Sequence, residues 1–186
     1  MPGSNSSTST RKIKIDSTLA LAVLSQRTTA QEEEPPLVTR DRIQLNLAGA
    51  ETVLQAAREK ATAMGLKVNI AIVDDGGHLL AFARMDGARP ASGSTALTKA
   101  VSAATFRQET GPLPAKGEPD LLLSLSLQSA ALASGGKLTS LKGGVPITVD
   151  GQVVGAIGVG GGTGDQDVEV AKAGIAALLD ALGDKR

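Results

Sequence analysis

The stretch that decides the fold is Val73-Asp74-Asp75-Gly76-Gly77-His78-Leu79-Leu80-Ala81-Phe82-Ala83-Arg84-Met85-Asp86-Gly87. An apolar run over residues 68–73 leads into it. The two aspartates and two glycines that follow are typical of a tight turn, since glycine adopts unusual backbone angles without steric cost. The pattern predicts an antiparallel hairpin in which residues 78–84 return beside residues 68–73.

A second hairpin is predicted near the C-terminus. Gly143-Gly144-Val145-Pro146-Ile147 and Gly155-Ala156-Ile157-Gly158-Val159-Gly160-Gly161 belong to two apolar runs, over residues 145–149 and 153–159. Between them lies Asp150-Gly151, a pair that favours the type I′ turn of a two-residue hairpin. The glycines at 158–164 are only a weak sign of a phosphate-binding loop, because no βαβ pattern or Gly-Lys-Ser/Thr ending accompanies them.

The other segments have helical patterns. From residue 39, where Thr39 or Asp41 would cap the helix, apolar residues recur every three or four positions up to Gly65. We expect further helices over residues 91–109, 120–133 and 163–182. The order helix, hairpin, helix, helix, hairpin, helix predicts an α+β domain, an antiparallel sheet with helices packed on it.

Composition limits the classes of function. The 186 residues suffice for one domain, and 19 basic and 19 acidic residues give a net charge of zero. Neither nucleic acid nor a membrane surface is therefore expected as a partner. The absence of Cys excludes disulfides and thiolate metal sites, and two Phe with no Tyr or Trp leave few rings to stack on a flat cofactor. We expect a small-molecule ligand.

The first residues differ from the rest. Residues 1–37 are predicted to be a disordered tail, because residues 1–10 are small and polar and Pro35-Pro36 ends an acidic run. Basic residues at 11–14 precede the apolar patch Leu19–Leu24, which is short for a secretory signal. We interpret this patch as part of the tail, with a degenerate targeting segment as the alternative. The folded domain is predicted over residues 38–186. We expect a cytoplasmic location, with export as the alternative.

Five side chains are candidates for chemistry: His78, Lys99, Arg84, Asp75 and Glu109. His78 is the only histidine, and its position after the turn also suits a structural role in which a ring nitrogen contacts a carboxylate. Lys99, Ser102 and Phe106 fall near one face of the predicted helix over residues 91–109, although a solvated lysine is an equal alternative. Arg84 can pair with Asp86 or bind a carboxylate ligand.

The two hairpins and the Lys99 helix together resemble one family, the GlcG/HbpS family of small haem-associated domains, over residues 38 to 182. The resemblance implies a profilin-like three-layer sandwich. We expect a homo-oligomer, because the leucine-rich face of segment 120–133 exceeds what one small core requires. The resemblance also implies haem as the candidate cofactor, and we expect no other. We expect no metal site, because a single His without a nearby Cys or Glu-x-x-His spacing makes a poor closed site. The ligand would lie in a cleft near the Lys99 helix and the 74–78 turn, with contacts from His78, Lys99, Ser102, Thr105 and Phe106.

Two classes of function follow, and the sequence leaves open whether the protein is an enzyme. The first is a binding module for haem or another small molecule, as the resemblance implies. The second is a cofactor-independent lyase, isomerase or hydrolase in the same cleft. There Lys99 and Arg84 would stabilise an anionic intermediate while His78, Asp75 or Glu109 moves a proton.

Overall fold

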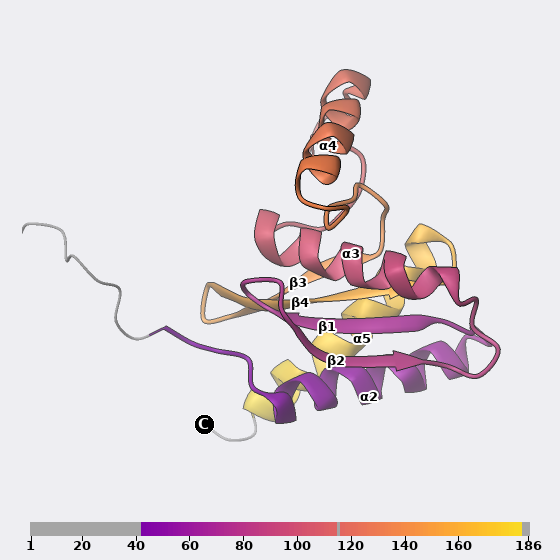
Figure 1. Ribbon diagram of the computed structural model, residues 1–186. Helices are drawn as coiled ribbons and strands as arrows, with labels where there is room; N and C mark the ends of the chain where they lie inside the picture. The colour runs from indigo at the N-terminus through magenta and orange to yellow at the C-terminus, as the bar shows by residue number, and fades with distance from the viewer. Residues whose placement is uncertain (1–41, 115, 184–186) are drawn as a thin grey trace, which may run out of the picture. The chain divides into compact units, whose positions relative to one another are not determined.

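A computed structural model describes residues 42–114 and 116–183. Its centre is a four-stranded antiparallel sheet with the strand order β2-β1-β4-β3 (Figure 1). The inner strands pair with Asn69 opposite Gly160 and Asp74 opposite Gly155. The strands are β1 (Asn69–Asp74), β2 (Leu79–Arg84), β3 (Gly144–Val149) and β4 (Gln152–Gly160).

Both predicted hairpins are confirmed. β1 pairs with β2, and β3 pairs with β4, in the antiparallel sense. The second turn has positive φ at both central residues, 46° at Asp150 and 76° at Gly151. Two positive φ angles are what a type I′ turn requires, and they explain why an Asp-Gly pair stands there.

Helices cover both faces of the sheet. α2 (Leu47–Ala63) and α5 (Gly164–Gly183) share one apolar core with the sheet, built from residues such as Val53, Val170 and Ile157. α3 (Ala91–Phe106) packs on the opposite face, where its alanines meet Ala71, Val73 and Ala156. The domain is therefore the α+β three-layer sandwich that we predicted.

Small residues let α3 approach the sheet closely. A Cβ atom on Gly158 of β4 would lie 2.0 Å from the carbonyl oxygen of Ala96, and one on Gly144 of β3 would lie 2.3 Å from that of Lys99. Any side chain at these positions would push the helix away. The first glycines of the 158–164 run therefore serve packing rather than the approach of a phosphate.

Two helix ends differ from the predictions. α2 begins at Leu47, because the Asn46 side chain accepts a hydrogen bond from the Gly49 amide and caps the helix there. The predicted caps at residues 39 and 41 lie outside the described residues, as does the predicted domain boundary between residues 37 and 38. α3 ends at Phe106 rather than at residue 109, since Arg107 takes a left-handed conformation with φ of 56°.

Helix α4 (Leu121–Ala133) follows a proline-rich loop and has no buried residue. Asp120 caps it by accepting a hydrogen bond from the Leu123 amide at 3.0 Å. In Figure 1 it lies beyond α3, on the side of α3 away from the sheet. Among the helices of the described residues, none is long and apolar enough to cross a membrane.

Candidate functional site

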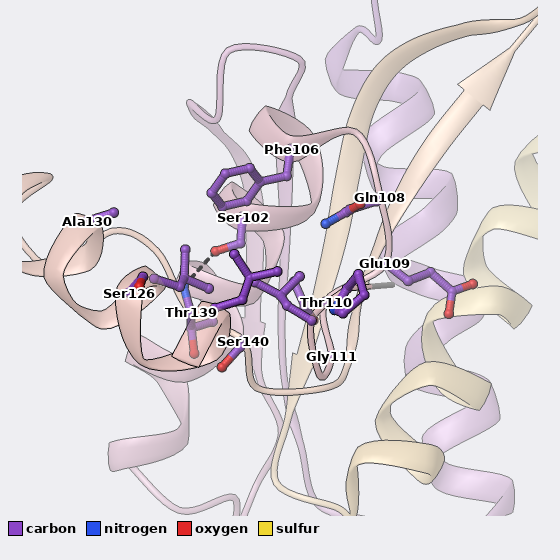
Figure 2. A pocket seen from close by; sticks show the side chains of 14 residues that line it. Ser102, Phe106, Gln108, Glu109, Thr110, Gly111, Ser126, Ala130, Thr139 and Ser140 are labelled. Atoms are coloured by element: carbon purple, nitrogen blue, oxygen red, sulfur yellow. Dashed lines mark hydrogen bonds between the residues drawn. The ribbon is translucent and has the colours of Figure 1, made fainter. Parts of the chain in front are cut away.

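A hollow of about 430 Å³ lies between the C-terminal end of α3, the loop that follows it, and α4. We call it the α3–α4 pocket. Figure 2 shows Ser102 and Phe106 of α3 on one side of it and Ser126 and Ala130 of α4 on another. The pocket brings together segments that are distant in the sequence.

Hydrogen bonds hold two walls of this pocket. The Ser102 hydroxyl is buried and accepts a hydrogen bond from the Thr139 amide at 2.8 Å (Figure 2). The Thr110 hydroxyl accepts from the Gly144 amide at 2.8 Å and donates to the Leu141 carbonyl at 2.7 Å. The loop after α3 is thus attached to the start of β3 and to the segment before it.

The lining of the pocket is mostly apolar. Phe106 is half-exposed and lines it together with Leu113, Leu123 and Leu127. Among the described lining residues Glu109 alone is charged, and its carboxylate pairs with Lys172 at 2.8 Å. No lysine, arginine or histidine is among the described residues that line the pocket. Such a surface suits an apolar ligand body.

Lys99 lies elsewhere on α3 and is not solvated. Its ammonium group donates hydrogen bonds to the Asp167 carboxylate at 2.7 Å and to the Val159 carbonyl at 2.8 Å. The pair lines a separate hollow of about 520 Å³ together with Arg89 and Lys142. The partner Asp167 was not among our candidates, because nothing in the sequence indicates which acidic residue 68 positions away meets Lys99.

His78 is exposed at the first hairpin, where its Nδ1 atom lies 3.2 Å from both carboxylate oxygens of Asp74. Burial acts to raise the pKa of Asp74, but hydrogen bonds from the amides of His78 and Gly76 and the contact with the imidazole outweigh it. The pKa of Asp74 is therefore held below its ordinary value. The structural interpretation of His78 agrees with this geometry.

The remaining candidates are dispersed. Asp75 pairs with Arg42. Arg84 is exposed at the end of β2, and the described part of the chain shows no ion pair between it and Asp86. The Thr105 hydroxyl donates to the Val101 carbonyl, on the side of α3 that meets the turn at Gly77.

Three of the eight candidate residues therefore share the α3–α4 pocket: Ser102, Phe106 and Glu109. Lys99 lines the second hollow, and the other four line neither. Within residues 42–114 and 116–183, no group of three or more His, Asp or Glu residues is placed to hold a metal ion.

Comparisons with known proteins give consistent matches. A family model described as haem degrading protein HbpS-like matches residues 45–176. Protein GlcG of Escherichia coli strain K12 is 41% identical over 110 residues, which make up 59% of this chain and 76% of GlcG.

Two solved structures share the fold. A double mutant of HbpS from Streptomyces reticuli is 33% identical, with a TM-score of 0.61 over 78% of this chain and 97% of that one. A complex of PduOC with haem is 27% identical, with a TM-score of 0.62 over 73% of this chain and 95% of that one.

Proposed function

Because this chain belongs to the HbpS-like family, we propose that it binds haem and that the haem ring lies in the α3–α4 pocket. The family description refers to haem, and the similar PduOC was solved in complex with it. The observation that carries the proposal is the apolar lining of the pocket around Phe106, one of only two aromatic residues in the chain.

The lining fits the body of a porphyrin. The volume of about 430 Å³ falls within the roughly 300–1,000 Å³ of typical ligand sites. Phe106 offers a ring face for offset stacking, and Leu123 and Leu127 of α4 lie in the same lining. The described lining holds no basic side chain to pair with the ring's carboxylates, so water is the better partner for them.

The side-chain groups of the described lining that could ligate an iron are oxygens. Haem iron in proteins is usually held by His, Cys, Met or Tyr, and none of these is among the described residues of the lining. Bound haem would supply the redox chemistry of its iron, while the walls bind the ring, orient it and exclude water from it. We therefore propose that apolar contacts with the ring hold the haem. His78, which contacts Asp74, has no role in haem binding in this proposal.

The cofactor-independent enzyme has less support from the geometry. It requires Lys99, Arg84 and His78 to converge on one substrate. Lys99 donates two hydrogen bonds within a buried pair, Arg84 stands at the end of β2, and His78 is exposed at a hairpin turn. We do not propose this reaction.

The test is a titration of the protein with haem, followed by visible absorption. We expect saturable binding that Phe106→Ala weakens at least about tenfold, since the stacked ring contributes both area and π contacts. Phe82→Ala is the matched control, because Phe82 is similarly exposed but does not line the pocket. Equal affinities of wild type and Phe106→Ala, with far-UV circular dichroism unchanged, would contradict the proposed site.

A further inference from the structure

The hollow of about 520 Å³ beside Lys99 lies at the end of β4. We call it the α3–α5 hollow, because the start of α3 and the start of α5 form two of its walls. It has no described lining residue in common with the α3–α4 pocket. Its charged residues are Arg89, Lys99, Lys142 and Asp167.

The lining of this hollow is positively charged. Of its described residues three are cations and one, Asp167, is a carboxylate, so two positive charges are in excess. Asp167 is already neutralised within the fold. One of its oxygens accepts a hydrogen bond from Lys99 at 2.7 Å, and the other accepts one from the Gly162 amide at 3.0 Å. The excess charge therefore belongs to Arg89 and Lys142.

These two cations are available to a ligand. Arg89 is exposed and forms no ion pair with any residue of the described ranges. The side chain of Lys142 is 45% exposed and pairs with Asp165, whose side chain is 84% exposed and is not in the described lining. An exposed pair of this kind is weak, so Lys142 can exchange Asp165 for an anionic ligand.

Hydrogen bonds fix the backbone that carries Arg89. The side-chain amide of Asn69, a buried residue of β1, donates to the Arg89 carbonyl at 3.0 Å. The Ser92 amide donates to the same carbonyl at 3.1 Å. The guanidinium group presents two parallel donors, a geometry that suits the oxygens of a carboxylate or a phosphate.

Ser92 indicates a ligand independently of the charges. It is only 7% exposed and lines the hollow, yet its hydroxyl forms no hydrogen bond with the residues that the structure describes. The neighbouring Thr95 hydroxyl, in contrast, donates to the Ser92 carbonyl at 2.9 Å. A buried hydroxyl without a partner is costly. An oxygen of an anion in the hollow would accept the missing hydrogen bond.

The start of α5 favours negative charge at the same place. The later glycines of the 158–164 run, Gly161, Gly162 and Gly164, line the hollow where α5 begins. The N-terminal end of a helix carries a partial positive charge. A Cβ on Gly164 would lie 2.8 Å from the Lys142 Cβ, so glycine there lets the lysine lie close to the helix start.

We propose that the α3–α5 hollow binds the phosphate group of a small molecule. Arg89 pairs with two of its oxygens, while Lys142 and the Ser92 hydroxyl donate to the others. A phosphate group carries a charge of about −1.5 to −2 at neutral pH, which matches the two excess positive charges. The inference does not depend on the ligand of the α3–α4 pocket, because the two linings are separate.

The first test titrates the isotope-labelled protein with inorganic phosphate and follows the backbone amides by NMR, with sodium chloride holding the ionic strength constant. We expect saturable shifts at Ser92, Gly162 and Gly164, with a millimolar dissociation constant for so small a ligand. Acetate, which carries one charge, should bind at least about fivefold more weakly. Shifts that stay linear up to about 50 mM phosphate, or acetate that binds as tightly as phosphate, would overturn the proposal.

The second test removes the unpaired cation. Arg89→Gln should weaken phosphate binding at least about tenfold, because charge-assisted hydrogen bonds to the ligand are lost. Arg58→Gln is the matched control. Arg58 is also exposed, but it lies on α2, on the other face of the sheet from α3, so its loss should change the affinity by less than about twofold. Equal effects of the two substitutions would show that phosphate responds only to the overall charge, and would refute the site.

The third test separates ligand binding by Ser92 from a structural role. Without phosphate, Ser92→Ala should leave the midpoint of thermal unfolding unchanged or slightly higher, because the substitution removes an unpaired buried hydroxyl. It should also reduce the rise in the midpoint that phosphate produces in wild type. A Ser92→Ala variant that unfolds at a lower temperature but keeps the full phosphate-induced rise would contradict the assignment of Ser92 as a donor to the ligand.

Discussion

The ammonium group of Lys99 lies 2.7 Å from the carboxylate of Asp167, and their side chains are only 7% and 2% exposed. Lys99 belongs to α3 and Asp167 to the first turn of α5, so the contact joins helices from opposite faces of the sheet. Gly143 leaves room for it, since a Cβ there would lie 2.7 Å from that of Asp167 and 2.8 Å from the Lys99 Nζ atom. The Lys99–Asp167 ion pair therefore links the helices on the two faces of the sheet.

Removing one partner of this pair should be costly. Lys99→Met leaves the Asp167 carboxylate buried without its cation, so we expect the free energy of unfolding to fall by about 3–5 kcal/mol. Urea unfolding followed by circular dichroism measures it, at one protein concentration for all variants. Lys60→Met is the control, because the Lys60–Glu169 pair is more exposed and should contribute less than about 1 kcal/mol.

The double variant Lys99→Met/Asp167→Leu separates the charge from the packing. With both charges gone no ion remains buried alone, so most of the lost stability should return. A Lys99→Met variant as stable as wild type would show that the Lys99–Asp167 pair contributes nothing to the free energy of unfolding.

The close approach of α3 to β4 gives a second prediction. A Cβ on Gly158 would lie 2.0 Å from the Ala96 carbonyl oxygen and 2.4 Å from the Ala100 amide nitrogen. Gly158→Ala should therefore lower the free energy of unfolding by about 3 kcal/mol, because backbone must move. Gly111→Ala, where a Cβ meets nothing within 4 Å, should change it by less than about 0.5 kcal/mol. Similar effects of the two substitutions would contradict the tight contact.

The first hairpin should show acid sensitivity. The pKa of Asp74 is lower in the folded protein than its ordinary 3.8, so its ionised form stabilises the fold. That contribution is complete well above pH 3.8 and is lost as the pH falls through the folded-state value. The difference in unfolding free energy between wild type and Asp74→Asn should therefore shrink on acidification below pH 3.8. A difference that is constant with pH would exclude this role.

Local patterns predicted the fold well. Both hairpins depend on turn residues adjacent to their strands, and the helices depend on spacing within one segment. The predicted start of the first helix was wrong. The apolar spacing begins at Ile43, whereas the N-cap at Asn46 makes the helix begin at Leu47. The alanines of α3 indicated close packing. The glycines that make room for the helix lie on β3 and β4, far along the chain, so the sequence did not show which residues α3 meets.

The site was less predictable because its contacts are distant in sequence. His78 and Asp74 are four residues apart, and a ring nitrogen on a nearby carboxylate was expected. Ser102 meets Thr139 across 37 residues, and α4 turned out to line the pocket although it had been considered only as a subunit contact. No pattern within one segment reports such pairings, so Lys99, Ser102 and Phe106 were placed in one cleft that the fold divides.

The most direct test of the account compares haem with iron-free protoporphyrin IX, each titrated into wild type and His78→Ala. If apolar contacts with the ring hold the ligand, the two ligands should bind with dissociation constants within about threefold of each other, since the described residues of the lining offer the iron no His, Cys, Met or Tyr ligand. His78→Ala should bind both as wild type does. Tight haem binding that protoporphyrin lacks and that His78→Ala abolishes would contradict the account and move the ligand to the first hairpin.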